Sequence, residues 1–332
     1  MNVISNFIKQ VNYALIEYQK KKKTSLVLGY PYWLTVDPSN ICNLHCPCCP
    51  TGQQRGTRSQ TQMSFDSFKK VMDKLGKYLL HIDFCNWGEP LLNRDIAKMA
   101  KYAKKYAPSM KVDTNLNVDM TPEFAEELIT SGLDRITMSV DGASQETYEK
   151  YRRAGNYAKA IENMKLLVET KKRFKGSGPH LHWQFLVFKH NEHELEKAKE
   201  LSKKIGVDSI GFTAPFCPVE MASTIEEFNK YKGKKEDTPI YKKLEEICNW
   251  PWDAITINAD GSISPCCSVE DQKDDFDNYF KKPFWMIWNG KKYRQARKHI
   301  ASRRGGFKDN VCVKCDHIGA SNHAGIRPAQ KR

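Results

Sequence analysis

Three cysteines near the N-terminus have a spacing that can support redox chemistry. Cys42, Cys46 and Cys49 follow the pattern Cys-x3-Cys-x2-Cys, which places three thiolates on one short loop. Such soft ligands suit an iron–sulfur cluster or zinc. A [4Fe–4S] cluster has four irons, so three cysteines leave one iron open to an outside ligand. A closed structural zinc site uses four protein ligands, which makes zinc the less favoured alternative.

A second group of cysteines lies in the C-terminal part of the chain. Asp260-Gly261, flanked by alternating apolar residues, is a strong β-hairpin signal, and a hairpin brings cysteines at its base together. The cysteines that could then surround one metal centre are Cys248, Cys266, Cys312 and Cys315. Cys267 could replace Cys266. Four thiolates also suit a zinc ribbon, and spacing alone does not separate the two kinds of site.

The elements that must position these cysteines follow an alternating pattern. Apolar strand candidates lie at 32–37, 80–86, 110–115, 134–140, 181–187 and 208–214, and helical candidates lie at 64–78, 93–107, 122–131, 144–151, 157–173 and 191–205. This order implies right-handed βαβ crossovers and a parallel sheet. Six such units suit an open, partial (β/α)6 barrel with its site at the carboxyl ends of the strands.

The predicted fold class is therefore α/β, and the chain divides into four regions. We expect an N-terminal helical extension at 1–30, the barrel at 31–218, a charged linker at 219–245 and a small hairpin and helix domain at 246–332. Apolar residues recur near helical spacing in the extension and lysines follow them. A helix docked on the barrel is the favoured interpretation, and a helix lying on a membrane surface through residues 1–23 is the alternative.

Composition limits the possible classes of protein. The 332 residues include 11 cysteines, and the formal net charge is +14. No apolar run approaches the roughly 18 residues of a membrane span, and no signal-peptide pattern is present, so we expect a cytoplasmic protein. Cysteines in that compartment indicate metal or redox use rather than disulfides. The positive charge predicts a well-solvated surface, with an anionic partner as the alternative.

The first cysteine pattern resembles the signature of the radical SAM superfamily. The resemblance implies a partial (β/α)6 barrel in which the open iron binds S-adenosylmethionine. It also implies that the reduced cluster cleaves this cofactor to a 5′-deoxyadenosyl radical. The cluster ligands would be Cys42, Cys46 and Cys49.

Predicted strand ends carry further matches to the family. Gly88, Glu89 and Pro90 resemble its Gly-Gly-Glu-Pro motif, with Trp87 in place of the first glycine. That motif binds the ammonium of the cofactor, although Glu89 could instead cap a helix. By the same resemblance Asn115 belongs to a Thr-Asn-Gly-like motif, Ser139 and Asp141 would contact ribose hydroxyls, and Arg152 would pair with the cofactor carboxylate.

The C-terminal pattern Cys248-x12-Gly261-x4-Cys266 resembles the SPASM and twitch extensions of this superfamily. The resemblance implies an auxiliary [4Fe–4S] cluster held by the four cysteines of the second group. A full SPASM extension continues with further cysteines, but none follows Cys315 and position 321 is Ser. The shorter twitch type with one auxiliary cluster is therefore predicted.

The family chemistry implies a radical that takes hydrogen from an unactivated C–H bond. An auxiliary cluster could accept the electron left on the substrate, which favours oxidation of a hydroxylated, sugar-like or cyclitol substrate. A thiol could instead return hydrogen and give an epimer, and Cys217, just past the last predicted strand, is the candidate donor. A buried structural cysteine is the alternative interpretation of this residue.

Two other functions stay open. One is modification of a ribosomal peptide by a maturase, and the more distant one is a zinc-containing nucleic-acid-binding protein. The chain carries no recognition-helix motif, so we expect no nucleic-acid partner. The expected partners are the small-molecule or peptide substrate and a reducing protein such as flavodoxin or ferredoxin.

Overall fold

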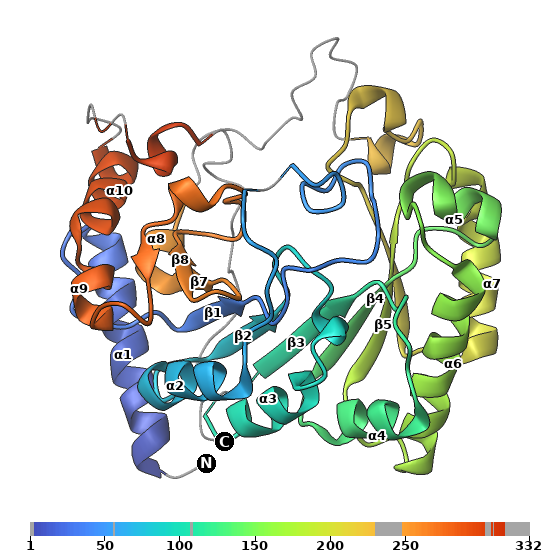
Figure 1. The fold of residues 1–332 in the computed structure, drawn as a ribbon, viewed down its shortest axis with the longest axis horizontal. Helices are drawn as coiled ribbons and strands as arrows, with labels where there is room; N and C mark the ends of the chain where they lie inside the picture. The colour runs from blue at the N-terminus through green and yellow to red at the C-terminus, as the bar shows by residue number, and fades with distance from the viewer. Residues whose placement is uncertain are drawn as a thin grey trace.

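The computed structural model describes residues 3–55, 57–106, 109–229, 248–302, 307 and 309–315. Residues 230–245, which make up most of the predicted linker, lie outside the described residues, as do residues 246 and 247 of the predicted C-terminal domain. The end of the predicted C-terminal domain, from residue 316 onward, also lies outside them. The described chain forms a curved sheet with helices along its outer side (Figure 1).

The sheet has nine strands in the order β6-β5-β4-β3-β2-β1-β7-β8-β9. They are β1 (Trp33–Val36), β2 (His81–Phe84), β3 (Ser109–Thr114), β4 (Arg135–Ser139), β5 (His180–Leu186), β6 (Ser209–Thr213), β7 (Ala254–Ile257), β8 (Ser262–Ser264) and β9 (Asp277–Asn278). Neighbours from β6 to β7 pair in parallel, and β8 and β9 are antiparallel additions. Since β6 and β9 are the two ends of this order, the sheet is open, and the predicted α/β partial barrel is confirmed.

Helices alternate with the strands as the sequence pattern predicted. They are α1 (Val3–Lys21), α2 (Phe65–Leu75), α3 (Ile96–Ala103), α4 (Pro122–Thr130), α5 (Gln145–Tyr151), α6 (Tyr157–Arg173), α7 (Leu195–Ile205), α8 (Trp250–Asp253), α9 (Phe284–Trp288) and α10 (Lys291–Ser302). Short 3-10 helices lie at Pro90–Leu92, Glu192–Glu194, Val219–Met221, Glu226–Phe228, Gln272–Asp274 and Val311–Val313. Several helices begin at a capping side chain: Ser64, Thr121 and Asn156 each accept a hydrogen bond from a backbone N–H in the first turn.

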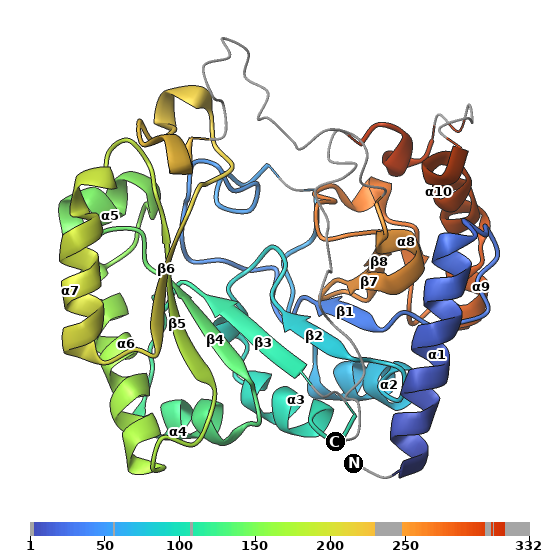
Figure 2. The same cartoon turned by 180° about the vertical axis from the view of Figure 1, so that it is seen from behind.

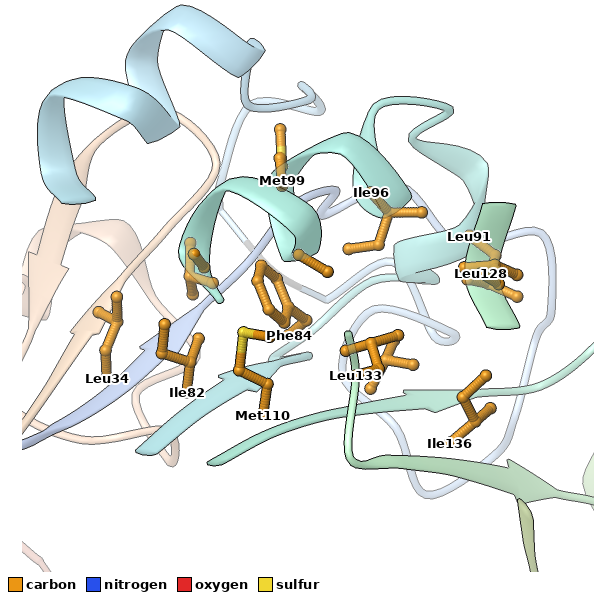
Figure 3. Packing of buried hydrophobic residues seen from close by; sticks show 14 of the residues in the cluster. Leu34, Ile82, Phe84, Leu91, Ile96, Met99, Met110, Leu128, Leu133 and Ile136 are labelled. Carbon is orange, nitrogen blue, oxygen red and sulfur yellow. The ribbon is translucent and has the colours of Figure 1, made fainter. Parts of the chain in front are cut away.

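The two faces of the barrel sheet differ in chemistry. Ile82 and Phe84 of β2 and Met110 of β3 are fully buried and pack against Ile96 and Met99 of α3 (Figure 3). Alternate residues of a strand point to opposite faces, so the residues between them line the inner face. Those inner residues are polar, which is unusual for parallel strands and leaves this face as the natural place for a site.

The C-terminal hairpin continues the barrel sheet. β7 pairs in parallel with β1, with Leu34 opposite Ile255 and Val36 opposite Ile257. The two strands lie side by side in both views (Figures 1 and 2). Gly261 turns the predicted hairpin with φ +81°, a left-handed backbone that favours glycine. The hairpin and the barrel therefore share one sheet, and the domain boundary at residue 246 stays a prediction.

Candidate functional site

The first cysteine loop leaves the carboxyl end of β1 and is fixed by neighbouring strand ends. Asp37 donates its backbone N–H to Ile257 O at 3.0 Å, and Glu89 donates its backbone N–H to Ile41 O at 2.9 Å. The Gly88 backbone can lie this close to the segment after β1 because it has no side chain. A Cβ at this position would lie 1.7 Å from Ser39 O. Any other residue here would displace the segment that leads into the cysteines.

The three predicted cysteines lie together on this loop. Cys46 is buried, and Cys42 and Cys49 are half-buried. Arg152 Nη1 lies 3.9 Å from the sulfur of Cys46, and Asn115 Nδ2 lies 3.8 Å from that of Cys42. Burial, together with smaller contributions from Glu89 and the thiols of Cys46 and Cys49, raises the pKa of Cys42 to about 12. A cluster binds thiolates, so loading it must displace these protons, while the two nearby N–H donors favour the sulfur anions.

The Glu89 carboxylate joins the ends of β2 and β3. It is 2% exposed and accepts hydrogen bonds from Leu91 N at 3.0 Å, Thr114 Oγ1 at 2.6 Å and Asn115 N at 2.7 Å. Burial raises its pKa, although the N–H of Asn115 opposes that rise. Glu89 is also the N-cap of the 3-10 helix Pro90–Leu92. Its geometry therefore matches the alternative interpretation, in which this acid caps a helix.

Asp141 and Arg152, expected to contact the cofactor separately, contact each other. Arg152 Nε donates to Asp141 Oδ2 at 2.6 Å, and Leu186 N donates to Asp141 Oδ1 at 2.7 Å. Asp141 is fully buried, as is most of Ser139 at the end of β4. Although burial opposes the charge of Arg152, the Asp141 carboxylate raises the pKa of this guanidinium. Asp141 therefore positions Arg152 beside the cysteine loop.

Cys217 belongs to an apolar cluster that includes residues of the cysteine loop. It is 8% exposed, and the other buried members of the cluster are Leu44, Cys46, Tyr151 and Phe188. A thiol packed this way matches the buried structural cysteine that was the alternative interpretation.

The second cysteine group is also brought together. Burial raises the pKa values of Cys266 and Cys312 well above the usual thiol range, and the nearby thiols of Cys248 and Cys315 raise both further. Cys267 neighbours Cys266, and its thiol also lies near Asp83 and Lys111 of the barrel. Among the described residues, no three His, Cys, Asp or Glu side chains are gathered as one metal ion would require. Two sets of thiols, of three and four, fit the donors of two iron–sulfur clusters.

An inner-face row of charged residues, Asp83, Lys111 and Asp113, was missed in the sequence. Lys111 Nζ lies 3.4 Å from Asp83 Oδ1 and 3.1 Å from Asp113 Oδ2. His81 Nε2 lies 2.8 Å from Asp83 Oδ1. Burial opposes the charge of Lys111, but Asp113 and Asp83 raise its pKa. The signal was present as polar residues at every second position of the strands, His81-x-Asp83 and Lys111-x-Asp113.

This row lies near the strand end that reaches the first cysteine group, and it neighbours Cys267. Asp113 is two residues before Asn115, whose amide reaches Cys42, and Lys111 is beside Cys267. Asp113 Oδ1 is buried and accepts no hydrogen bond from any described residue. Farther along the same face, burial and, to a lesser extent, Arg135 lower the pKa of His182 to about 4, so this imidazole is neutral at pH 7.

The segment after the first cysteines is tied to the C-terminal hairpin. Arg58 forms a two-pronged ion pair with Asp275, in which Nη2 lies 2.7 Å from Oδ1, and it also donates to Val269 O. Trp87 Nε1 donates to the same carbonyl at 2.9 Å. A cavity of about 260 Å³ opens beside these contacts; its lining includes Asn40, Gln54, Gln60 and Glu270.

These features define a class of protein: an iron–sulfur enzyme built on an open α/β barrel. A family model described as the radical SAM superfamily matches residues 36–202, and the SPASM iron–sulfur cluster-binding domain matches residues 248–316. The chain therefore belongs to the radical SAM superfamily. Its cofactors are S-adenosylmethionine, the [4Fe–4S] cluster that binds it, and an auxiliary [4Fe–4S] cluster in a SPASM/twitch-type extension.

Curated relatives share only part of their length with this chain. It is 27% identical over 166 residues to the AdoMet-dependent heme synthase of Methanosarcina barkeri, covering 50% of this chain and 45% of that protein. It is 29% identical over 140 residues to the mycofactocin maturase MftC of Mycolicibacterium smegmatis, covering 41% and 35%. The match thus spans less than half of either relative.

Solved structures share the fold over nearly the whole chain. Streptococcus suis SuiB bound to S-adenosylmethionine aligns with a TM-score of 0.61 at 14% identity, covering 92% of this chain and 74% of SuiB. BtrN in complex with AdoMet and 2-DOIA aligns with a TM-score of 0.52 at 15% identity, covering 91% and 97%. At such identities the likeness shows the fold.

Proposed function

We propose that this radical SAM enzyme oxidises a hydroxylated, sugar-like or cyclitol substrate. The observation that carries the proposal is the inner-face row, in which half-buried charges lie on the inner face of the barrel beside Cys267. Hydroxyl groups can both donate to Asp83 and Asp113 and accept from Lys111. An apolar substrate would remove the solvent from these charges and offer their remaining lone pairs and N–H groups no hydrogen bond, at a free-energy cost. The fold is shared with BtrN, which was solved with 2-DOIA bound.

The cofactor sites are part of the same proposal. We assign Cys42, Cys46 and Cys49 to the first cluster, and Cys248, Cys266, Cys312 and Cys315 to the auxiliary cluster. Gly88, Glu89, Pro90 and Asn115 would shape the cofactor pocket at the strand ends, together with Ser139 and the Asp141–Arg152 pair. When bound, S-adenosylmethionine on the reduced first cluster would supply a 5′-deoxyadenosyl radical, and the auxiliary cluster in its oxidised form would supply an electron acceptor.

The chain's own residues then have defined tasks. Oxidation of a secondary alcohol removes a hydrogen atom from carbon, a proton from oxygen and one electron, and it leaves a carbonyl group. Lys111 would orient the substrate oxygen, and the partly exposed Asp113 carboxylate would accept the hydroxyl proton. Epimerisation would need a thiol donor. Cys217 packs against Cys46 in an apolar cluster, so oxidation is the version that we favour.

Peptide modification is the second candidate. MftC is a maturase, and SuiB was also solved bound to its precursor peptide SuiA. The same inner face would then receive a polar side chain of a peptide. The two candidates differ in which substrate stimulates the enzyme to cleave S-adenosylmethionine.

A reducing partner such as flavodoxin or ferredoxin would dock on α10. Lys291, Arg294 and Lys298 are exposed at helical spacing and line a cavity of about 360 Å³. Tyr293 of the same helix lies beside Cys312 and Cys266. An acidic partner bound to the basic face of α10 would therefore be separated from the auxiliary thiols by this helix. The cytoplasm stays the proposed location because the described cysteines form no disulfide.

The test compares substrates on anaerobically reconstituted protein containing about eight irons per chain. Mass spectrometry would follow 5′-deoxyadenosine with cyclitols, sugars or peptides. Lys111→Met should lower substrate-stimulated 5′-deoxyadenosine at least about tenfold, the value of one charged hydrogen bond, and leave the background without substrate unchanged. Lys104→Met, at an exposed ion pair with Asp134, is the control. Turnover of peptides alone, or a Lys111→Met enzyme as active as wild type, would contradict the proposal.

A further inference from the structure

The N-terminal helix α1 is held to the protein by its polar side. Lys9 is 1% exposed, and its ammonium donates to Leu79 O at 2.5 Å and also to Tyr106 O. Asn12 exchanges two hydrogen bonds of 2.8 Å with the backbone of Tyr30. Gln19 Oε1 accepts hydrogen bonds from the backbone N–H groups of the segment after the helix. Side-chain to backbone hydrogen bonds, together with buried Ile16, therefore fix the orientation of α1.

The opposite side of α1 is an apolar stripe that faces solvent. Phe7 is 64% exposed, Val11 is 50% exposed and Tyr18 is 60% exposed, and Ile4 and Ala14 are exposed on the same side. At 100° per residue these five positions fall within about 80° of one another, whereas Lys9, Asn12, Ile16 and Gln19 lie on the other side. Surface helices normally turn the apolar side inward, so α1 is inverted.

Lysines continue this apolar stripe at the C-terminal end of the helix. Lys21, Lys22 and Lys23 are exposed and form no ion pair with any described residue. Lys22 Nζ lies 5.9 Å from the centre of the Tyr18 ring, so a cation lies directly at the end of the stripe. Leu26 and Leu28, 46% and 56% exposed, follow immediately. α1 lies at one side of the molecule in both views (Figures 1 and 2).

We propose that α1 seats the protein on an anionic lipid surface, with its apolar stripe in the headgroup region and its lysines on lipid phosphates and carboxylates. Helices that lie in a membrane interface combine these two features. The helix is not a membrane span, since no described helix has the length and apolar character to cross a bilayer. The inner leaflet of the cytoplasmic membrane carries the negative charge that this surface would meet.

A second copy of the chain is a poorer occupant of the same stripe. Pairing two α1 helices antiparallel would place Lys21 to Lys23 against a first helical turn that contains no acidic residue. Each chain also carries a formal net charge of +14, so two copies repel. Lipids offer both the apolar layer and the negative charge, and a dimer offers only the first.

The test is sedimentation of the full-length protein with vesicles of phosphatidylcholine alone or with about 30% phosphatidylserine. Wild type should pellet with the anionic vesicles and much less with neutral ones. Phe7→Ser combined with Val11→Ser should lower the partition coefficient about tenfold or more, because two apolar side chains no longer insert. Replacing Lys21, Lys22 and Lys23 by Glu should lower it about a hundredfold or more, at roughly fivefold per lysine.

Matched controls separate this surface from general charge and stickiness. Lys203→Glu with Lys204→Glu on α7, and Phe280→Ser at another exposed apolar residue, should pellet like wild type. The α1 variants should keep wild-type melting temperatures, since the changed side chains are exposed. Failure of wild type to bind anionic vesicles would overturn the proposal. So would equal binding by the α1 variants, or a dimer in solution that Phe7→Ser with Val11→Ser abolishes.

Discussion

Replacing Arg58 tests whether the two cysteine regions depend on one buried ion pair. The side chains of Arg58 and Asp275 are only 7% and 6% exposed. Arg58 also donates to Ser262 and Ser264 of the hairpin strand β8. Arg58→Met keeps most of the side-chain length but leaves the Asp275 carboxylate buried without its charge partner. Breaking one side of a buried pair costs about 3–5 kcal/mol, so the free energy of unfolding should fall by that amount.

A double-mutant cycle separates the pair from the shape of the side chains. Arg58→Met with Asp275→Leu removes both charges, and this combination should recover most of the stability, because apolar replacements of a buried pair are often neutral. Lys69→Met is the control, since Lys69 and Asp73 form an exposed pair on α2 with both side chains over 40% exposed. That change should cost less than about 1 kcal/mol.

Urea denaturation of the reduced, cluster-free protein, followed by tryptophan fluorescence, measures these differences. Midpoints should rank wild type and Lys69→Met highest, the double variant next and Arg58→Met lowest. A loss below about 1 kcal/mol for Arg58→Met would refute the reasoning. So would a double variant that is as unstable as Arg58→Met, because the loss would then come from packing and not from the stranded carboxylate.

Three further changes test other parts of the site. Burial raises the pKa of Asp37 from 3.8 to about 7, so the folded chain holds this proton more tightly than the unfolded chain, and stability falls between about pH 4 and 7. Urea denaturation at several pH values measures this decline in the free energy of unfolding, and Asp37→Asn should remove up to roughly 4 kcal/mol of it. Curves of unfolding free energy against pH that run parallel for variant and wild type would contradict this. In Gly88→Ala the new Cβ would lie 1.7 Å from Ser39 O, so the cysteine loop should be displaced and the iron content should fall. The free energy of unfolding should fall by about 1–3 kcal/mol or more. Gly176→Ala, with no atom within 4 Å, should cost only the left-handed backbone strain of about 1–2 kcal/mol and keep full iron. Cys217→Ala should leave product formation by a dehydrogenase nearly unchanged, whereas loss of product with continued 5′-deoxyadenosine release would favour the epimerase.

The parts of the site that sequence could predict are local. Cys42, Cys46 and Cys49 are close because seven or fewer residues separate them, so their spacing alone predicts a shared loop. The strand and helix order also predicted the barrel, because hydrophobic period and βαβ handedness leave few arrangements. The four C-terminal cysteines needed the hairpin signal at Gly261, and the structure brings them together.

The parts that sequence could not predict depend on distant partners. Periodicity in α1 identified an apolar side, but it did not say that Lys9 would find the carbonyls of Leu79 and Tyr106 and turn that side outward. Nothing local predicts that β7 pairs with β1. The mutual pairing of Asp141 and Arg152 likewise depends on tertiary placement, although each was identified by resemblance.

The position of β1 between β2 and β7 has a consequence for biosynthesis. Trp33 to Val36 leave the ribosome early, but their partners from Ala254 to Ile257 are made more than two hundred residues later. Until then β1 presents an unpaired strand edge, the kind of surface that recruits other chains into aggregates. Nascent chains stalled before residue 254 should therefore need chaperone protection. Both edges of β1 can be paired only after β7 has been synthesised.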